Sequence, residues 1–334
     1  MQPLLQVGLG PLGQAMVRDL AARGRGPVLA AVDTAPELAG RPLQELVPEA
    51  EGAVRIEAEL EAALADERLQ AALVTTSSDL SRCAPTLRAL LRRGLAVVTT
   101  CEEALWPWLR HPELADELDQ LAREHGGRLL GTGVNPGFLM DTFPAQVTAV
   151  CRSVRSFESW RIQDATTRRL PFQAKIGATL DDDAFEAKRQ DGSLRHVGLG
   201  ESLHLAAAAL GLSIDEWEES LEPVKAEQPL ECGLGPIPLG VAAGVRQVAV
   251  GRSAGEQVAR LEFVAAIGQA DPHDRVRIEG EPPLDVRIEG GVHGDVATIA
   301  IAVNALDALH DAPPGLHTML SIPPVTVSGA RRAR

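Results

Sequence analysis

The 334-residue sequence contains no tyrosine, so every mechanism in which a tyrosine hydroxyl acts as the general acid is excluded. Only four cysteines occur, Cys83, Cys101, Cys151 and Cys232, and their spacings match no metal-binding motif. The zinc-binding HExxH pattern and the Walker phosphate loop are also missing. We therefore expect free thiols in a reducing compartment and no metal site.

Long apolar runs, basic patches and a leader-like start are missing too. No apolar segment approaches the roughly 20 residues that a membrane-spanning helix needs, and the opening MQPLLQVGLG has no basic region before an apolar one. The 46 acidic residues outnumber the 32 basic ones, and the formal net charge of −14 repels nucleic acids and anionic membranes. We expect a cytoplasmic protein with no nucleic-acid or membrane partner.

The first part of the chain alternates strand-type and helix-type patterns. Apolar runs predict strands over residues 4–9, 28–32, 54–56, 71–75, 95–100 and 128–132. Spaced apolar residues predict helices over 11–23, 58–67 and 80–93, and another that contains Leu114, Leu118 and Leu121. Strands that alternate with helices through short loops form parallel sheets. We therefore expect a Rossmann-type doubly wound α/β domain over residues 1–145.

After about residue 150 the pattern changes. Strand-type runs over 154–163, 246–251, 257–267 and 276–278 follow one another, and one alanine-rich helix over 200–210 interrupts them. We expect a second α+β domain over residues 146–294 with a mixed, largely antiparallel sheet. Residues 295–334 are expected to form a helix over 296–309, with Asp295 as its N-cap, and a proline-rich tail that is not helical from Pro313 on.

A glycine-rich turn, Gly8-x-Gly10-x-x-Gly13, follows the first predicted strand and opens the first predicted helix. Gly8 allows the tight turn, Gly10 lets the backbone approach a pyrophosphate, and Gly13 lets the helix pack close to the sheet. The pyrophosphate would bind amides of the first helical turn around Leu12, while Pro11 lacks an N–H that would be unpaired there. The pattern predicts a nicotinamide dinucleotide site; a turn without function is the alternative.

Asp33 ends the second predicted strand, twenty positions after the last of these glycines. Its carboxylate would accept hydrogen bonds from the adenine ribose and repel a 2′-phosphate, and no Arg or Lys follows within several residues. We therefore expect NAD(H), with NADP(H) as the second choice. Thr76 and Ser77, after the strand 71–75, are expected beside the nicotinamide-side ribose, although ordinary loop residues would look the same. Thr100, the last residue of the predicted strand 95–100, is assigned to the cofactor as well.

Two acidic residues, Glu102 and Glu103, follow the strand 95–100, where ligands bind in open α/β sheets. Either could act in the reaction, or could simply stabilise the positive end of a helix dipole. The loop GTGVNPGF at 131–138 follows another strand end and is either a binding loop or a domain linker. His293, in the turn GGVHGD, is either a proton shuttle or a turn cap.

Taken together, the motifs resemble those of the NAD(P)-dependent 2,4-diaminopentanoate dehydrogenases and the related native amine dehydrogenases, which share the dihydrodipicolinate reductase-like architecture. The resemblance covers most of the chain. It rests on VGLGPLG near the start, VTTCEE at 98–103, GTGVNPGF at 131–138, DATTRR from 164, QAKIG from 173 and GGVHGDVAT at 290–298. Dihydrodipicolinate reductases resemble the chain less, because it has no His-His motif. Homoserine dehydrogenases place a lysine where this chain has Glu102.

The resemblance implies reversible oxidative deamination of a primary amine to a ketone and ammonia. A carboxylate suits this reaction, because it stabilises the cationic iminium ion and shuttles protons. The resemblance implies this role for Glu102, with Glu103 as the alternative. It also implies a homodimer formed through the second domain, and a last helix that packs on the cofactor domain. It assigns these residues to the border of the substrate pocket: Asn135, Phe138, Trp160, Arg161 and His196.

Two other functions stay open. An amino-acid substrate such as 2,4-diaminopentanoate would need a fixed cation for its carboxylate, and Arg161, Arg168, Arg169 and Lys175 are available. An inward-facing guanidinium would favour such a substrate, whereas a closed apolar pocket would favour small ketones. The second possibility is a non-catalytic protein that senses NAD(P) and binds NADH without turnover.

Overall fold

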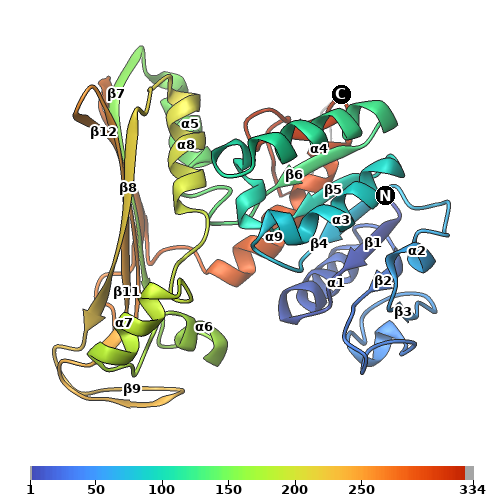
Figure 1. Ribbon diagram of the computed structural model, residues 1–334, viewed down its shortest axis with the longest axis horizontal. Coiled ribbons are helices and arrows are strands. Elements are labelled where there is room, and N and C mark those ends of the chain that lie inside the picture. The colour runs from blue at the N-terminus through green and yellow to red at the C-terminus, as the bar shows by residue number, and fades with distance from the viewer. Residues whose placement is uncertain (1, 328–334) are drawn as a thin grey trace. The chain divides into compact units, whose positions relative to one another are not determined.

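The computed structural model describes residues 2–327, which divide into two compact units (Figure 1). The first unit comprises the residues before Leu139 and those from His293 on, and the second runs from Leu139 to Val292. The first boundary therefore lies at 138–139 rather than at the predicted 145–146. Asp141 already belongs to the second unit, where it accepts a hydrogen bond from the Ser202 hydroxyl at 2.7 Å. The part of the predicted tail beyond residue 327 lies outside the described residues.

The first unit is built on a sheet of seven parallel strands in the order β15-β6-β5-β4-β1-β2-β3. The strands are β1 (Leu4–Val7), β2 (Val28–Val32), β3 (Ile56–Glu57), β4 (Ala71–Val74), β5 (Ala96–Thr99), β6 (Arg128–Gly131) and β15 (Gly315–His317). Central strands such as β4 and β5 are apolar and buried throughout, as expected when helices cover both faces of a parallel sheet. The predicted doubly wound α/β fold is confirmed. Strand β15 was not predicted, because three residues within a proline-rich tail carry no strand pattern.

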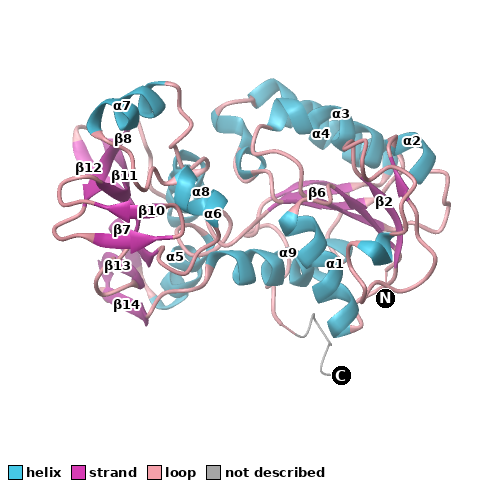
Figure 2. Cartoon of the chain, turned by 90° about the horizontal axis from the view of Figure 1, so that it is seen from below, coloured by secondary structure: helices cyan, strands magenta, loops and turns pink. Residues whose placement is uncertain are grey.

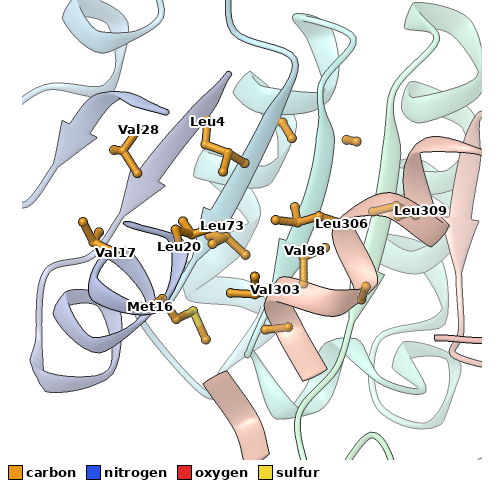
Figure 3. Close-up of a cluster of buried hydrophobic side chains, with 14 of the residues drawn as sticks. Leu4, Met16, Val17, Leu20, Val28, Leu73, Val98, Val303, Leu306 and Leu309 are labelled. Atoms are coloured by element: carbon orange, nitrogen blue, oxygen red, sulfur yellow. The ribbon is translucent and has the colours of Figure 1, made fainter. Parts of the chain in front are cut away.

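Helices cover both faces of this sheet (Figure 2). They are α1 (Pro11–Arg23), α2 (Leu60–Ala63), α3 (Leu80–Arg92), α4 (Pro112–His125) and α9 (Gly294–His310), with 3₁₀ turns η1 (Leu43–Glu45), η2 (Glu102–Ala104) and η3 (Pro107–Leu109). Residues of α1 and α9, among them Met16, Leu20, Val303 and Leu306, bury their side chains with those of β1, β4 and β5 (Figure 3). Helices α3 and α4 bury theirs on the other face. The last helix thus packs on the first unit's sheet.

Two predicted details of these helices differ from the structure. The N-cap of α9 is His293 rather than Asp295: His293 has the extended backbone of a cap, and its Nδ1 accepts a hydrogen bond from the Val296 amide at 3.4 Å. Asp295 lies inside the first helical turn. Helix α2 covers four residues instead of the predicted 58–67. Helix α1 matches its prediction, because Pro11 opens it and Gly24, with φ of 58°, ends it in the left-handed region.

The second unit contains a six-stranded sheet in the order β14-β13-β7-β12-β11-β8. Its strands are β7 (Ser153–Asp164), β8 (Glu216–Lys225), β11 (Ala242–Ser253), β12 (Glu256–Ala266), β13 (His273–Glu281) and β14 (Leu284–Glu289), with a separate hairpin of β9 (Leu230–Cys232) and β10 (Gly235–Ile237). Only β7 and β12 pair in parallel, so the predicted mixed, largely antiparallel sheet is confirmed.

The helices of the second unit are α5 (Thr142–Val147), α6 (Leu170–Lys175), α7 (Asp182–Gln190) and α8 (Leu199–Leu210), with the 3₁₀ turn η4 (Thr148–Val150). Only α8 was predicted. Helix α7 buries a single side chain, Phe185, so its sequence carries no apolar stripe. Over residues 2–327, no helix has the length and apolar character to cross a membrane, and no three His, Cys, Asp or Glu side chains gather as a metal site requires.

Candidate cofactor and catalytic site

The glycine-rich turn lies between β1 and α1, and its three glycines meet different surroundings. Gly8 has φ of 88°, and a Cβ there would lie 2.7 Å from the Thr75 carbonyl oxygen. A Cβ on Gly13 would lie 2.0 Å from the Gly8 carbonyl oxygen, whereas a Cβ on Gly10 would meet nothing within 4 Å. The first turn of α1 has no acidic residue and no side-chain cap. Gly10 and the helix N-terminus therefore leave open space and amides for a pyrophosphate.

Two polar side chains that the sequence analysis missed brace this turn. The Gln6 amide donates to the Gly8 carbonyl at 2.9 Å and to the Thr75 hydroxyl at 3.0 Å. The Thr75 hydroxyl in turn donates to the same Gly8 carbonyl at 2.9 Å. Gln6 is 1% exposed, and a buried polar side chain needs such partners. The signal was present in the sequence, since Gln6 is the only polar residue in the strand LLQV.

Asp33 directly follows β2, and its carboxylate is held beside the same turn. One oxygen accepts a hydrogen bond from the Leu9 amide at 2.6 Å, and the other accepts one from the Ala35 amide at 2.9 Å. The next basic residue in the sequence, Arg41, pairs with Glu45. The negative charge of Asp33 is thus fixed in place, where a ribose diol could bind it and a phosphate would be repelled.

The predicted nicotinamide-side residues lie at the ends of β4 and β5. The Thr76 methyl group would be 3.0 Å from a Cβ on Gly8, so Thr76 borders the glycine-rich turn. Ser77 uses its hydroxyl to accept a hydrogen bond from the Asp79 amide at 3.1 Å, just before α3. Thr100 extends the strand pairing, because its amide donates to the Val74 carbonyl at 3.1 Å. All three therefore lie at the carboxyl edge of the sheet.

Glu102 and Glu103 form the start of η2, immediately beyond β5 at the same edge. Both are partly buried. One carboxylate oxygen of Glu103 accepts a hydrogen bond from the Leu80 amide at 2.9 Å and lies 2.9 Å from His111 Nε2. A Cβ on Gly131 would lie 2.4 Å from the Ala104 backbone, so the end of β6 packs closely on η2. Glu103 therefore joins the starts of α3 and α4 to η2.

Two thiols, Cys83 and Cys101, lie close to η2. Cys83 donates a hydrogen bond to the Ser77 carbonyl at 3.5 Å, and Cys101 donates one to the Ser78 carbonyl at 3.2 Å. The interaction with Cys101 lowers the pKa of Cys83 to about 7, while the interaction with Cys83, together with burial, raises the pKa of Cys101. Both thiols are free and buried, so the expectation of free thiols is confirmed for this pair.

The loop at 131–138 carries Asn135 and Phe138. It folds closely on itself, because Gly137 has φ of 129° and a Cβ there would lie 2.3 Å from the Gly133 amide nitrogen. The Val134 amide also donates to the Thr298 hydroxyl of α9 at 3.3 Å. The unit boundary falls just after Phe138. The segment is thus a tightly packed loop of the first unit that also begins the connection to the second.

Trp160 and Arg161 are neighbours on β7, so their side chains point to opposite faces of the second sheet. Arg161 is 2% exposed, its Nη1 lies 3.1 Å from Asp274 Oδ1, and its Nη2 donates to the Val292 carbonyl at 3.0 Å. Burial lowers the pKa of Arg161 and raises the pKa of Asp274. On the other face, the Arg275 guanidinium lies 5.5 Å from the centre of the Trp160 ring. The structure does not bring Trp160 and Arg161 together.

His196 lies in the segment before α8, and its ring stacks on Phe263 with centroids 4.5 Å apart. The side-chain amide of Gln247, which is fully buried, holds the His196 backbone from both sides. Its oxygen accepts from the His196 amide at 2.8 Å, and its nitrogen donates to the His196 carbonyl at 2.9 Å. Sequence reasoning missed Gln247, since a single glutamine in a strand carries no indication of its partner.

A doubly wound parallel sheet, a glycine-rich turn after β1, an aspartate after β2 and a second unit with a mixed sheet define a two-domain dinucleotide-dependent dehydrogenase. Residues 138–333 match the sequence model of the 2,4-diaminopentanoate dehydrogenase C-terminal domain, and the chain belongs to this family. The family identified from the motifs is thereby confirmed.

Individual proteins show the same relationship. The chain is 27% identical over 325 residues to the 2,4-diaminopentanoate dehydrogenase of Acetoanaerobium sticklandii, covering 95% of this chain and 92% of that protein. It is 26% identical over 348 residues to the amine dehydrogenase of Streptomyces virginiae, covering 95% and 94%. The solved amine dehydrogenase of Mycobacterium smegmatis has the same fold, with a TM-score of 0.83, 21% identity and 97% coverage of both chains. A more distant fold relative, the WlbA dehydrogenase of Bordetella pertussis, was solved with NADH (TM-score 0.52, 16% identity, coverage of 93% and 89%).

Proposed function

We propose that the chain catalyses the reversible, NAD(P)-dependent reductive amination of a ketone with ammonia, which in the other direction is the oxidative deamination of a primary amine. One observation carries the proposal. In a member of the 2,4-diaminopentanoate dehydrogenase family, Glu102 lies at the carboxyl end of β5, and β5, β4 and β1 are neighbours in the sheet. Strand β1 ends in the glycine-rich turn, so a carboxylate and the dinucleotide turn share one edge.

The residues present fit a nicotinamide dinucleotide. The amides of Leu12 and Gly13, with the open space at Gly10, would hold the pyrophosphate. The Asp33 carboxylate would accept hydrogen bonds from the hydroxyls of the adenine ribose. Thr76, Ser77 and Thr100 lie where the nicotinamide-side ribose is expected. When bound, the cofactor accepts or supplies the hydride.

Glu102 is proposed as the acid–base group. The iminium ion formed from ketone and ammonia is a cation, and a nearby carboxylate lowers its energy. The same carboxylate takes a proton from ammonium, which makes ammonia a nucleophile, and returns a proton when water leaves. Glu103 is the alternative candidate; one of its oxygens accepts a hydrogen bond from the Leu80 amide and lies 2.9 Å from His111 Nε2.

NAD(H) is proposed as the preferred form of the cofactor, because the charge of Asp33 is fixed by two backbone amides. A 2′-phosphate would face that charge. Replacement Asp33→Asn keeps an acceptor for one amide and removes the charge, so the kcat/KM for NADPH should rise relative to that for NADH, about tenfold for a change of 1.4 kcal/mol. The measurement is kcat/KM with NADPH and with NADH, for the wild type and for the variant. A wild-type preference for NADPH would contradict the proposal.

A cytoplasmic homodimer formed through the second unit is also proposed. Helix α8 covers one face of the six-stranded sheet, where Gly251 lies against Leu203. The opposite face carries Trp160, Val248 and Val250, which are only partly buried. Partly exposed apolar side chains on a broad sheet face favour association with a second copy. Sedimentation of wild type and of Val250→Glu measures this: a dimer that the variant dissociates is expected, and a monomeric wild type would contradict it.

An amino-acid substrate such as 2,4-diaminopentanoate is the second candidate. Arg161 has a buried, inward-facing guanidinium, and such a group would favour an amino-acid substrate. Its charge, however, is already compensated by Asp274. We therefore place simple amines and ketones first. The test is a spectrophotometric panel that follows NAD⁺ reduction at alkaline pH with 2,4-diaminopentanoate, simple primary amines, amino acids and hydroxy acids. Turnover of amines supports the proposal, turnover of hydroxy acids alone overturns it, and NADH binding without any turnover would identify a sensor.

A further inference from the structure

Glu103 and His111 connect three elements of the first unit at the candidate site. Glu103 lies in η2, and one carboxylate oxygen is 2.9 Å from the amide of Leu80, the first residue of α3, and 2.9 Å from Nε2 of His111, the residue before α4. The Glu103 and His111 side chains are 16% and 23% exposed, so water competes little for these bonds. A single carboxylate oxygen therefore holds two helix starts together.

The remaining contacts of this region show why that oxygen matters. Asp79 caps α3 by accepting hydrogen bonds from the Ser81 and Arg82 amides, at 2.8 and 3.2 Å. The Leu80 amide is not among the amides that Asp79 binds, and Glu103 satisfies it. The Glu103 amide also donates to the Ser78 carbonyl at 3.4 Å. Side chain and backbone of Glu103 thus both attach η2 to the segment that begins α3.

We propose that Glu103 and His111 are positioning residues, which hold η2, and with it Glu102, in the orientation needed for the reaction. The proposal rests on the proposed function, because it takes Glu102 as the acid–base group. Glu102 precedes Glu103 directly in a tight turn, so a rotation that releases the Glu103 side chain also moves Glu102. A misplacement of about 1 Å at a reacting group lowers rates by as much as about a hundredfold.

Two substitutions at Glu103 separate positioning from catalysis. Glu103→Ala removes the acceptor for both Leu80 and His111, and we expect kcat for reductive amination to fall about tenfold to a hundredfold, with the KM for NADH unchanged. Glu103→Gln can place its amide oxygen where that carboxylate oxygen lies, where it still accepts a hydrogen bond from the Leu80 amide and one from an Nε2–H of His111. We therefore expect Glu103→Gln to restore most of kcat.

His111→Ala provides the second measurement. It should lower kcat less than Glu103→Ala does, because the Leu80 bond remains, and the double variant should be no slower than Glu103→Ala alone. The matched control is Glu117→Ala. Glu117 of α4 binds Arg88 of α3 at 2.6 and 2.7 Å and so joins the same two helices without touching η2. This control should leave kcat at the wild-type value, whatever it does to the melting temperature.

The outcomes are distinct. Wild-type turnover of amines, with Glu103→Gln active and Glu103→Ala slow, supports the inference. If Glu103→Gln is as inactive as Glu103→Ala, Glu103 itself is the acid–base group and the inference is overturned. If Glu103→Ala and His111→Ala both keep the wild-type kcat, the contacts of Glu103 and His111 do not position Glu102, and the inference is overturned. An absence of amine turnover in the wild type would refute the proposed function instead, independently of the variants.

Discussion

The two units of the molecule hold their buried polar groups in different ways. In the first unit, polar side chains at the candidate site bind backbone groups at strand ends and helix starts, as Gln6 does with Gly8 and Glu103 with Leu80. In the second unit, buried side chains join strands to the segments beside them, as Arg161 and Asp274 do around Val292. In the first unit, these bonds orient polar side chains at the carboxyl edge of the sheet. In the second unit, they hold one segment of the chain against another.

This difference between the units separates residues whose replacement should affect activity from residues whose replacement should affect stability. Glu102 and Glu103, at the carboxyl edge of the parallel sheet, are only partly buried, so replacing Glu102 should alter activity more than folding. The Arg161–Asp274 pair lies within the core of the second unit, so replacing one partner should alter folding first. Three substitutions test this separation.

The largest effect is expected at Glu102. Glu102→Gln removes the charge that stabilises the iminium ion and the site that accepts a proton, so reductive amination should fall by about 10²–10⁴-fold. The dissociation constant for NADH, measured by its fluorescence, should stay within about twofold, since the glycine-rich turn and Asp33 are unchanged. Unaltered turnover would remove Glu102 from the mechanism, and lost NADH binding would indicate damage to the fold.

At Arg161, we expect a substitution to lower the stability of the fold without directly altering the catalytic step. Arg161→Ala leaves the Asp274 carboxylate buried without its cation and should lower the free energy of unfolding by about 3–5 kcal/mol. Denaturant titration of the wild type and variant measures this difference. Exposed Arg155 on the same strand provides the control, and Arg155→Ala should change stability by less than about 0.5 kcal/mol. Equal stability of wild type and Arg161→Ala would contradict the anchoring role of the pair.

The smallest of the three effects is expected at Gly10. Gly10→Ala should leave the melting temperature of the cofactor-free protein unchanged, because a Cβ there meets nothing within 4 Å. The added methyl group would occupy the approach to the pyrophosphate and raise the KM for NADH, by about tenfold if about 1.4 kcal/mol of binding is lost. Gly13→Ala is the opposite case, since its Cβ would lie 2.0 Å from a carbonyl oxygen. A lower melting temperature for Gly10→Ala than for Gly13→Ala would reverse this assignment.

Much of the first unit could be predicted because its signals are local. Strand β2 and helix α1 lie within their predicted limits, since an apolar run, a proline at the helix start and a glycine at its end are all adjacent in sequence. Partners far apart in sequence could not be predicted. Arg161 and Asp274 are separated by 113 positions, and Gln247 and His196 by 51. Nothing near any one of these residues indicates which partner it meets.

The sequence by itself determined the fold class, the dinucleotide turn and the family, because glycine spacing, apolar periodicity and acidic strand ends are short-range patterns. Only the tertiary structure showed that α3 and α4 bring the Leu80 amide and His111 to Glu103. Only the structure, too, showed that Arg161 is paired with Asp274. A buried charge without a partner costs so much free energy that the role of a buried residue such as Arg161 depends on the residue that pairs with it. The fold determines which residue that is.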